Sequence, residues 1–98
     1  MSVECTRHHN GKVVCKFLGR IDTTKCIDAE KVVMESIEGA EVIVFDLDGV
    51  EYVASSFLRL CGKASHKVDT NNFSIVNVVP SVKKVFKVSG LSEKLNVQ

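Results

Sequence analysis

An apolar run that leads through a short acidic loop into an amphipathic segment constrains the fold of this chain most. Residues 41–47 hold a continuous apolar stretch, which is typical of a strand covered on both faces. Asp48-Gly49 then marks a turn, and apolar residues at helical spacing begin near Ser55. The stretch therefore predicts a strand, a loop and a helix in direct succession.

Two serines, Ser55 and Ser56, stand where the loop is expected to enter the helix. The first turn of a helix has unpaired backbone N–H groups and the positive end of the helix dipole, so it favours an anionic group. A serine at this place either caps the helix with its hydroxyl or accepts a phosphate. The residues alone leave both interpretations open.

The first part of the chain predicts a β-hairpin, with strands over residues 3–7 and 13–18 around Asn10-Gly11. A two-residue loop would place the apolar residues of the two strands on opposite faces. A three-residue loop with a glycine bulge places them on one face, so we expect the bulged hairpin. The residues on that face would be Val3, Cys5, Val13, Cys15 and Phe17.

Three helices follow from apolar residues at helical spacing. The first opens at Asp22 or Thr23, either of which can cap it, and ends at Gly39. The second runs from Ser55 to about residue 66. The third begins at Pro80, near the position that proline favours, and ends at Gly90. The expected core-facing residues are Cys26, Ala29, Val33 and Ile37 in the first, Phe57, Leu60, Cys61 and Ala64 in the second, and Val82, Val85, Phe86 and Leu91 in the third.

With a further strand over residues 73–79, the predicted order is β-β-α-β-α-β-α. A strand, a helix and a strand in succession favour a right-handed crossover with parallel pairing. We therefore expect an α/β fold: one mixed β-sheet with helices mainly on one face. A chain of 98 residues is enough for one such domain and too short for two.

Composition narrows the classes of function. The formal net charge of +1 gives no reason to expect nucleic acid or a membrane as partner. No apolar run approaches the roughly 20 residues of a membrane span, and the first residues carry no signal peptide, so we expect a cytoplasmic protein. The four cysteines form no C-x-x-C pair and are interpreted as buried free thiols.

The sequence contains no pattern typical of a metal site or of a catalytic site. Asp46, Asp48 and Glu51 cluster after the central strand, but without the ligand spacing of a cation loop. His8 and His9 would point to opposite faces of a strand. No signature of a nucleophile with its base, and no glycine-rich phosphate loop, occurs. We therefore expect no metal, no cofactor and no enzymatic activity.

Three segments together resemble STAS domains of the bacterial anti-sigma factor antagonist type. They are residues 19–24 (Gly-Arg-Ile-Asp-Thr-Thr), residues 44–56 with the paired serines, and residues 79–91, a proline-started helix that ends in Ser-Gly-Leu. The resemblance covers nearly the whole chain in the right order. It implies a single STAS domain over residues 1–98.

The resemblance also implies a mechanism. Such a domain, a monomer when free, binds an anti-sigma factor that is also a serine/threonine kinase and thereby releases a sigma factor. Phosphorylation of one serine ends the binding, and a PP2C-type phosphatase restores it. The matching acceptor is Ser55, with Ser56 as second choice. The implied partner-binding residues are Asp22, Thr23, Ala54, Ser56, Phe57 and Arg59.

The chain departs from the family motif at two positions: Ala54 stands for an Asp and Phe57 for a Gly. The ring of Phe57 either fills the space that glycine leaves for a kinase's nucleotide or turns inward into the core. The alternative function is that of a STAS scaffold without phosphorylation, or a subunit of a signalling or transport complex.

Overall fold

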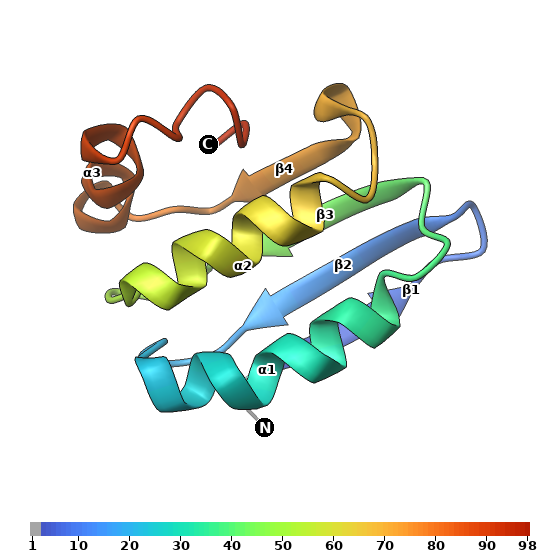
Figure 1. Ribbon diagram of the computed structural model, residues 1–98, viewed down its shortest axis with the longest axis horizontal. Helices are drawn as coiled ribbons and strands as arrows, with labels where there is room; N and C mark the ends of the chain where they lie inside the picture. Colours follow the sequence, from blue (N-terminus) through green and yellow to red (C-terminus); the bar gives the residue numbers. More distant parts are fainter. Residues whose placement is uncertain (1–2) are drawn as a thin grey trace.

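The computed structural model of the chain describes residues 3–98 and contains the predicted order of elements (Figure 1). The elements are β1 (Val3–Arg7), β2 (Lys12–Phe17), α1 (Thr23–Ser36), β3 (Val42–Asp46), α2 (Ser55–Ser65), the 3₁₀ turn η1 (Thr70–Asn72), β4 (Phe73–Val76) and α3 (Pro80–Val88). The expected β-β-α-β-α-β-α order is confirmed.

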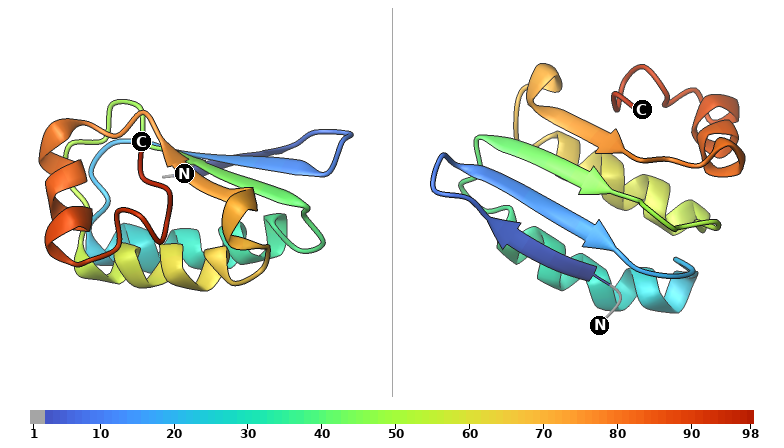
Figure 2. Two further views of the ribbon diagram at one scale, coloured as in Figure 1. Left: turned by 90° about the horizontal axis from the view of Figure 1, so that it is seen from above. Right: turned by 180° about the vertical axis from the view of Figure 1, so that it is seen from behind.

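The four strands form one mixed sheet in the order β1-β2-β3-β4. β1 and β2 are antiparallel, whereas β2, β3 and β4 are parallel to one another. α1 and α2 lie on the same side of the sheet, and α3 lies beyond the end of the strands (Figure 2, left). Seen from behind, the other face carries no helix of residues 3–98 (Figure 2, right). The prediction of helices mainly on one face is therefore confirmed.

The hairpin between β1 and β2 has the expected bulged loop. The backbone N–H of His8 donates to the carbonyl of Lys12 at 2.8 Å, and the N–H of Gly11 donates to the carbonyl of His8 at 3.1 Å. Gly11 adopts φ = +84°, a conformation that glycine reaches without strain. The register places Cys5 directly opposite Cys15, so the apolar residues of both strands share one face.

The expectation that the central strand is covered on both faces is wrong. Ile43 and Phe45 have no exposed surface, but Val42 and Val44 are only half-buried. Both crossover helices pack on the same face of the sheet, so the alternate residues of β3 lie on the open one. The apolar run of β3 therefore serves two different faces, one in the core and one toward solvent.

The core is built around five phenylalanine rings, all fully buried. Three of their contacts are edge-to-face, with centroid separations of 5.0 Å, 4.9 Å and 5.1 Å for the pairs Phe17–Phe45, Phe17–Phe57 and Phe45–Phe73. Such pairs add about 0.5–1.5 kcal/mol each beyond the area they bury. The fifth ring, Phe86, brings α3 to the same core.

The apolar stripes of α1 and α2 are buried as predicted, and that of α3 is buried in part. Val82 and Phe86 face the core, but Val85 is 38% exposed, which corrects its place on the buried face. The strand before α3 is also shorter than expected: it ends at Val76, where Asn77 turns the chain with φ = +57°.

A short C-terminal segment closes the outer edge of β4. Val97 forms a parallel bridge with Ile75, and the N–H of Gln98 donates to the carbonyl of Ile75 at 2.8 Å. In the part of the chain that the structure describes, no helix is both long and apolar enough to cross a bilayer.

Candidate functional site at the start of α1 and α2

The segments that lead into α1 and α2 lie side by side. Ile21 and Val53 form a parallel bridge. The N–H of Ile21 donates to the carbonyl of Tyr52 at 3.0 Å, and the N–H of Ala54 donates to the carbonyl of Ile21 at 2.8 Å. The next residues, Asp22 and Ala54, are therefore neighbours, and both helices start at the same edge of the domain (Figure 1).

α1 begins with a side-chain cap. Asp22 precedes the helix in an extended conformation, and its Oδ1 accepts a hydrogen bond from the backbone N–H of Lys25 at 2.9 Å. Asp22 therefore satisfies one of the backbone donors that a helix start leaves unpaired. Of the two caps considered for this helix, the structure selects Asp22 over Thr23.

α2 begins without a side-chain cap. The N-cap position is Ala54, which makes no side-chain capping bond. The backbone N–H of Phe57 donates to the carbonyl of Ala54 across this turn, at 2.9 Å. Ser55 and Ser56 lie inside the helix, so neither serine is its N-cap. The capping interpretation of the two serines is therefore wrong.

The two hydroxyl-bearing residues differ in exposure. Ser55 is exposed, whereas Ser56 Oγ is buried and has no hydrogen-bond partner within residues 3–98. Ser56 lies against the Cys26 thiol of α1. Burial raises the pKa of Cys26, and the nearby Ser56 hydroxyl opposes that rise. In the folded domain the Ser55 side chain is therefore open to solvent, whereas the Ser56 hydroxyl is not.

The ring of Phe57 turns inward. It has no exposed surface and packs edge-to-face on Phe17, with its centroid 6.2 Å from that of Phe45. The space beside Ser55 is therefore not filled by this ring. Ala54 is 7% exposed, so neither side chain lies on the exposed surface of the free domain. That Phe57 and Ala54 contact a partner stays a prediction.

One carboxylate of the acidic loop before α2 stabilises the loop itself. Asp46 Oδ1 accepts hydrogen bonds from the N–H of Asp48 and from Nδ2 of Asn77, both at 3.0 Å. These bonds join the exits of β3 and β4 and fix the loop. Asp48 and Glu51 are exposed. Within residues 3–98, no three His, Cys, Asp or Glu side chains are grouped so that they could hold a metal ion.

An arginine stacked on a tyrosine adds two site residues that the sequence reasoning missed. The guanidinium carbon of Arg20 lies 3.9 Å from the centroid of the Tyr52 ring, and Tyr52 is 40% exposed. With Gly19, Gly49 and Glu51 they line a small hollow of about 280 Å³ beside the start of the helices. The sequence offered one sign of this contact: Arg20 and Tyr52 directly precede Ile21 and Val53, the two residues that pair in the bridge.

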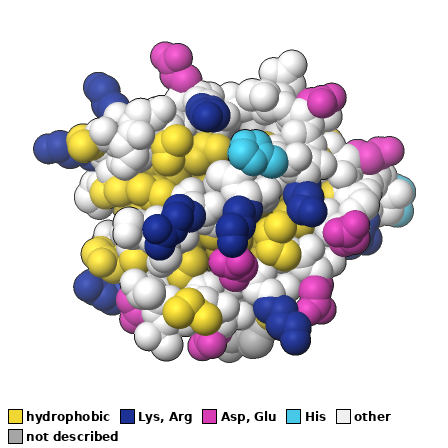
Figure 3. Space-filling model, in the orientation of Figure 1, with side chains coloured by type: hydrophobic (Ala, Val, Ile, Leu, Met, Phe, Trp, Pro, Cys, Tyr) yellow, Lys and Arg dark blue, Asp and Glu magenta, His cyan; other side chains and the backbone are white. Residues whose placement is uncertain are grey.

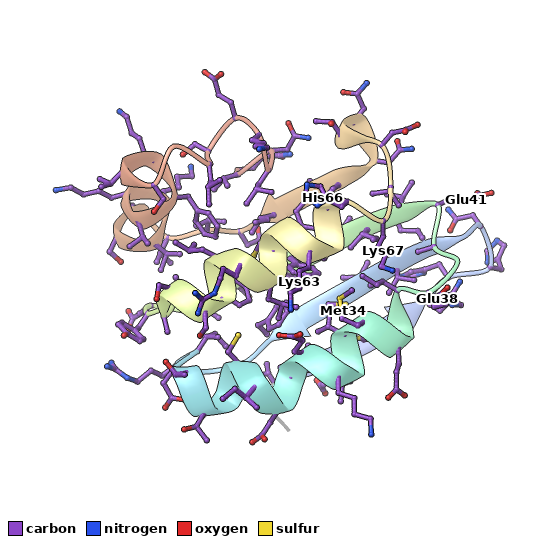
Figure 4. The ribbon with its side chains drawn as sticks, in the orientation of Figure 1. Met34, Glu38, Glu41, Lys63, His66 and Lys67 are labelled. Atoms are coloured by element: carbon purple, nitrogen blue, oxygen red, sulfur yellow. The ribbon has the colours of Figure 1, made fainter. Side chains whose placement is uncertain are left out.

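The exposed side of α2 and the turn after it is basic. Figure 3 shows Lys and Arg side chains in a row over α2, and the exposed basic residues there are Arg59, Lys63 and Lys67. Lys63 Nζ pairs with Glu30 Oε2 of α1 at 2.9 Å. Figure 4 places Lys63 near Met34, between the two helices, and Lys67 farther along, toward Glu41. Arg59 lies one helical turn from Ser55.

The structure thus brings Asp22, Thr23 and Arg59 to the same edge as Ser55, together with Arg20 and Tyr52. We call the exposed part of this edge the Ser55 surface: Arg20, Thr23, Glu51, Tyr52, Ser55 and Arg59.

Comparisons with known proteins agree with this architecture. The family model of the STAS domain matches residues 4–98. A search of curated proteins gives no match.

Several solved structures share the fold. An anti-sigma-factor antagonist (STAS) domain protein from Planctomyces limnophilus is 22% identical, with a TM-score of 0.83 over 98% of this chain and 87% of that one. The anti-sigma factor antagonist SpoIIAA in its unphosphorylated form is 18% identical, with a TM-score of 0.79 over 98% and 87%. SpoIIAA of Bacillus in its phosphorylated form is 17% identical, with a TM-score of 0.70 over 98% and 90%.

Proposed function

Because the chain belongs to the STAS domain family, we propose that it is a non-enzymatic binding module of the anti-sigma factor antagonist type. Its partner in this proposal is a cytoplasmic anti-sigma factor that is also a serine/threonine kinase. The unmodified domain, a monomer when free, binds that partner. Phosphorylation of Ser55 ends the binding, and a PP2C-type phosphatase restores it.

The observation that carries the proposal is the exposure of Ser55 at a helix start that has no side-chain cap. The Ser55 hydroxyl is not needed to cap α2, so a kinase can modify it without removing a capping bond. Ser56, the second choice for the acceptor, is disfavoured because its Oγ is buried. One structural relative, the Bacillus SpoIIAA, has a solved structure in its phosphorylated form.

The local electrostatics tolerate a phosphate at this position. A phosphoserine carries about −1.5 to −2 charges near pH 7, and the start of α2 offers unpaired N–H groups and the positive end of the helix dipole. Arg59, one turn later and exposed, provides a nearby cation. Phosphorylation would therefore leave the domain folded and act on the partner.

The change that the partner meets would be electrostatic. The exposed carboxylates Asp48 and Glu51 already stand in the loop before Ser55, so a phosphate would add to a negative field. We propose that the partner contacts the Ser55 surface together with Asp22, and that like-charge repulsion with an acidic group of the partner ends the complex.

A STAS scaffold without phosphorylation is the second candidate. It is favoured by Ala54 and Phe57, which stand where the resembling motif has Asp and Gly. The inward ring of Phe57 weakens this reading, because the ring does not occupy the space next to Ser55.

The experiment is to incubate the purified chain with ATP and each candidate anti-sigma factor kinase of the same organism, and to map phosphate by mass spectrometry. We expect phosphate on Ser55, none on the Ser55→Ala variant, and normal modification of the matched Ser56→Ala variant. In a pull-down, Ser55→Asp should lose the partner that the unmodified chain retains. Absence of phosphate from Ser55 with undiminished binding of Ser55→Asp would establish the scaffold instead.

A further inference from the structure

Two cysteines face each other across the first two strands. Cys5 of β1 and Cys15 of β2 are register partners, and their Sγ atoms are 3.0 Å apart. Both are free thiols. No other part of the proposed function uses them, because they lie on the sheet and not on the Ser55 surface.

The backbone at this pair suits a disulfide. In an antiparallel ladder, hydrogen-bonded pairs alternate with non-hydrogen-bonded pairs, in which the Cα atoms are closer, at about 4.5 Å. His8 donates to Lys12, so this alternation makes Cys5 and Cys15 a non-hydrogen-bonded pair. A Cα separation of about 4.5 Å lies within the range of about 4.4–6.8 Å in which disulfides form. The two strands therefore need little movement to be cross-linked.

The pair has one accessible and one enclosed member. Cys5 is half-buried, whereas Cys15 has no exposed surface. The Cys15 thiol can donate a hydrogen bond to an ionised Cys5, and this bond lowers the pKa of Cys5 to about 7; burial works against the shift, and the Ser36 hydroxyl adds to it. The Cys5 thiol is therefore partly ionised at neutral pH, which favours its reaction with an oxidant, and the Cys15 sulfur is already in contact with it.

We propose that Cys5 and Cys15 are a redox modification site, at which a hydroperoxide drives formation of a reversible cross-strand disulfide. The Cys5 thiolate attacks the outer peroxide oxygen, the O–O bond breaks, and Cys5 becomes a sulfenic acid while the leaving oxygen takes a proton. The Cys15 sulfur then attacks the Cys5 sulfur. The S–O bond breaks, and hydroxide leaves with the Cys15 proton as water. The two thiols lose two electrons in total, and hydrogen peroxide is reduced to two molecules of water.

The other two cysteines provide an internal contrast. Cys26 and Cys61 are 2% and 0% exposed, and burial raises the pKa of both thiols. They are therefore protonated at neutral pH and shielded from an oxidant in solution. Oxidation of the folded chain should be confined to the pair on β1 and β2.

The test treats the fully reduced, folded chain with hydrogen peroxide. The peroxide is removed, the chain is unfolded in urea with N-ethylmaleimide to block every remaining thiol, and it is digested with trypsin without reduction. Cleavage after Arg7, Lys12 and Lys16 releases residues 1–7 and 13–16 as separate peptides. We expect these two peptides to be joined, lighter by two hydrogen atoms than their sum, and separated again by dithiothreitol. Cys26 and Cys61 should carry the maleimide.

Two variants separate the steps. With Cys15→Ser, Cys5 should stop at the sulfenic acid and be trapped by dimedone, whereas Cys26→Ala should cross-link as the unmodified chain does. Recovery of Cys5 and Cys15 with maleimide after peroxide, or a link that involves Cys26 or Cys61, would overturn the proposal. The peptide map of the unmodified chain decides this even if a variant does not fold.

Discussion

α1 and α2 start side by side but are held in different ways. α1 is fastened by a hydrogen bond, because Asp22 caps the N–H of the third helical residue, Lys25. α2 is fastened by burial, because its third residue, Phe57, places its ring in the aromatic core while the N-cap, Ala54, contributes no side-chain bond.

This difference shows how a helix start can stay free for modification. A capping side chain occupies the donors that an incoming phosphate would use. At α2 no side chain caps the helix, and the buried ring of Phe57 holds the first turn against the core instead. The backbone N–H groups of that turn therefore bind no capping side chain.

Replacing Phe57 with Ala should destabilise the domain by about 3–5 kcal/mol, the range for buried aromatic residues. The ring contacts Phe17 and lies near Phe45, and no cap remains to hold the turn. Urea denaturation followed by circular dichroism measures the loss. Leu58→Ala, at the half-buried neighbour, serves as control and should cost less. Equal losses would show that α2 is not anchored by Phe57.

The free energy of unfolding should also fall at alkaline pH, because α2 buries the thiol of Cys61. Burial raises the pKa of Cys61 well above its ordinary value of 9.0. The unfolded thiol ionises first as pH rises past 9, so the unfolded state is favoured there by up to about 1.4 kcal/mol per pH unit. Below pH 9 both states keep the proton and no effect is expected. Unfolding free energies between pH 8 and pH 10 measure it, and Cys61→Ala should lose this part of the slope. An unchanged slope would contradict the assignment.

Removing the cap of α1 should cost about 1 kcal/mol, the typical value for an Asp or Ser cap replaced by Ala. Asp22→Ala tests this in the same denaturation assay, and Asp22→Asn should retain most of the stability because its amide oxygen can still accept. Asp28, exposed in the middle of α1, gives the matched control as Asp28→Ala. If both alanine variants unfold alike, the Asp22 bond contributes no net stability.

A charge at Ser55 should have the smallest effect on stability. Ser55→Asp places an anion in the first turn of α2 and should stabilise the fold by about 0.3–1 kcal/mol, whereas Ser55→Lys should destabilise it by a similar amount. The difference between the two variants should shrink in high salt, because screening weakens exposed charges. A large loss of stability in Ser55→Asp would contradict the proposal that a phosphate at Ser55 leaves the domain folded.

The order of the elements and the hairpin loop could be predicted because both follow from local patterns. Apolar residues alternate along the chain on both sides of Asn10-Gly11. Of the two loop lengths considered, only the three-residue loop places them on one face of the hairpin. Helical spacing also placed Phe57 correctly among the buried residues of α2. The comparison with the family motif left open whether the ring fills the space beside Ser55 or turns inward, and the spacing favoured the inward position that the structure shows.

The remaining features depend on partners distant in sequence. Val42 to Phe45 is apolar throughout, so the run alone could not reveal that one face of β3 stays open. The bond from Asn77 to Asp46 requires the pairing of β3 with β4. The stacking of Arg20 on Tyr52 requires the bridge between Ile21 and Val53. No local pattern encodes these contacts.

The closed edge of β4 limits how copies of this domain could stack. Because the segment around Val97 already pairs with Ile75, β1 is the one edge of the described sheet without a neighbouring strand. Unpaired edges are the route by which folded domains polymerise into continuous sheets. Two chains could therefore join their sheets at β1 directly, whereas a strand that approached β4 would first have to displace the segment around Val97.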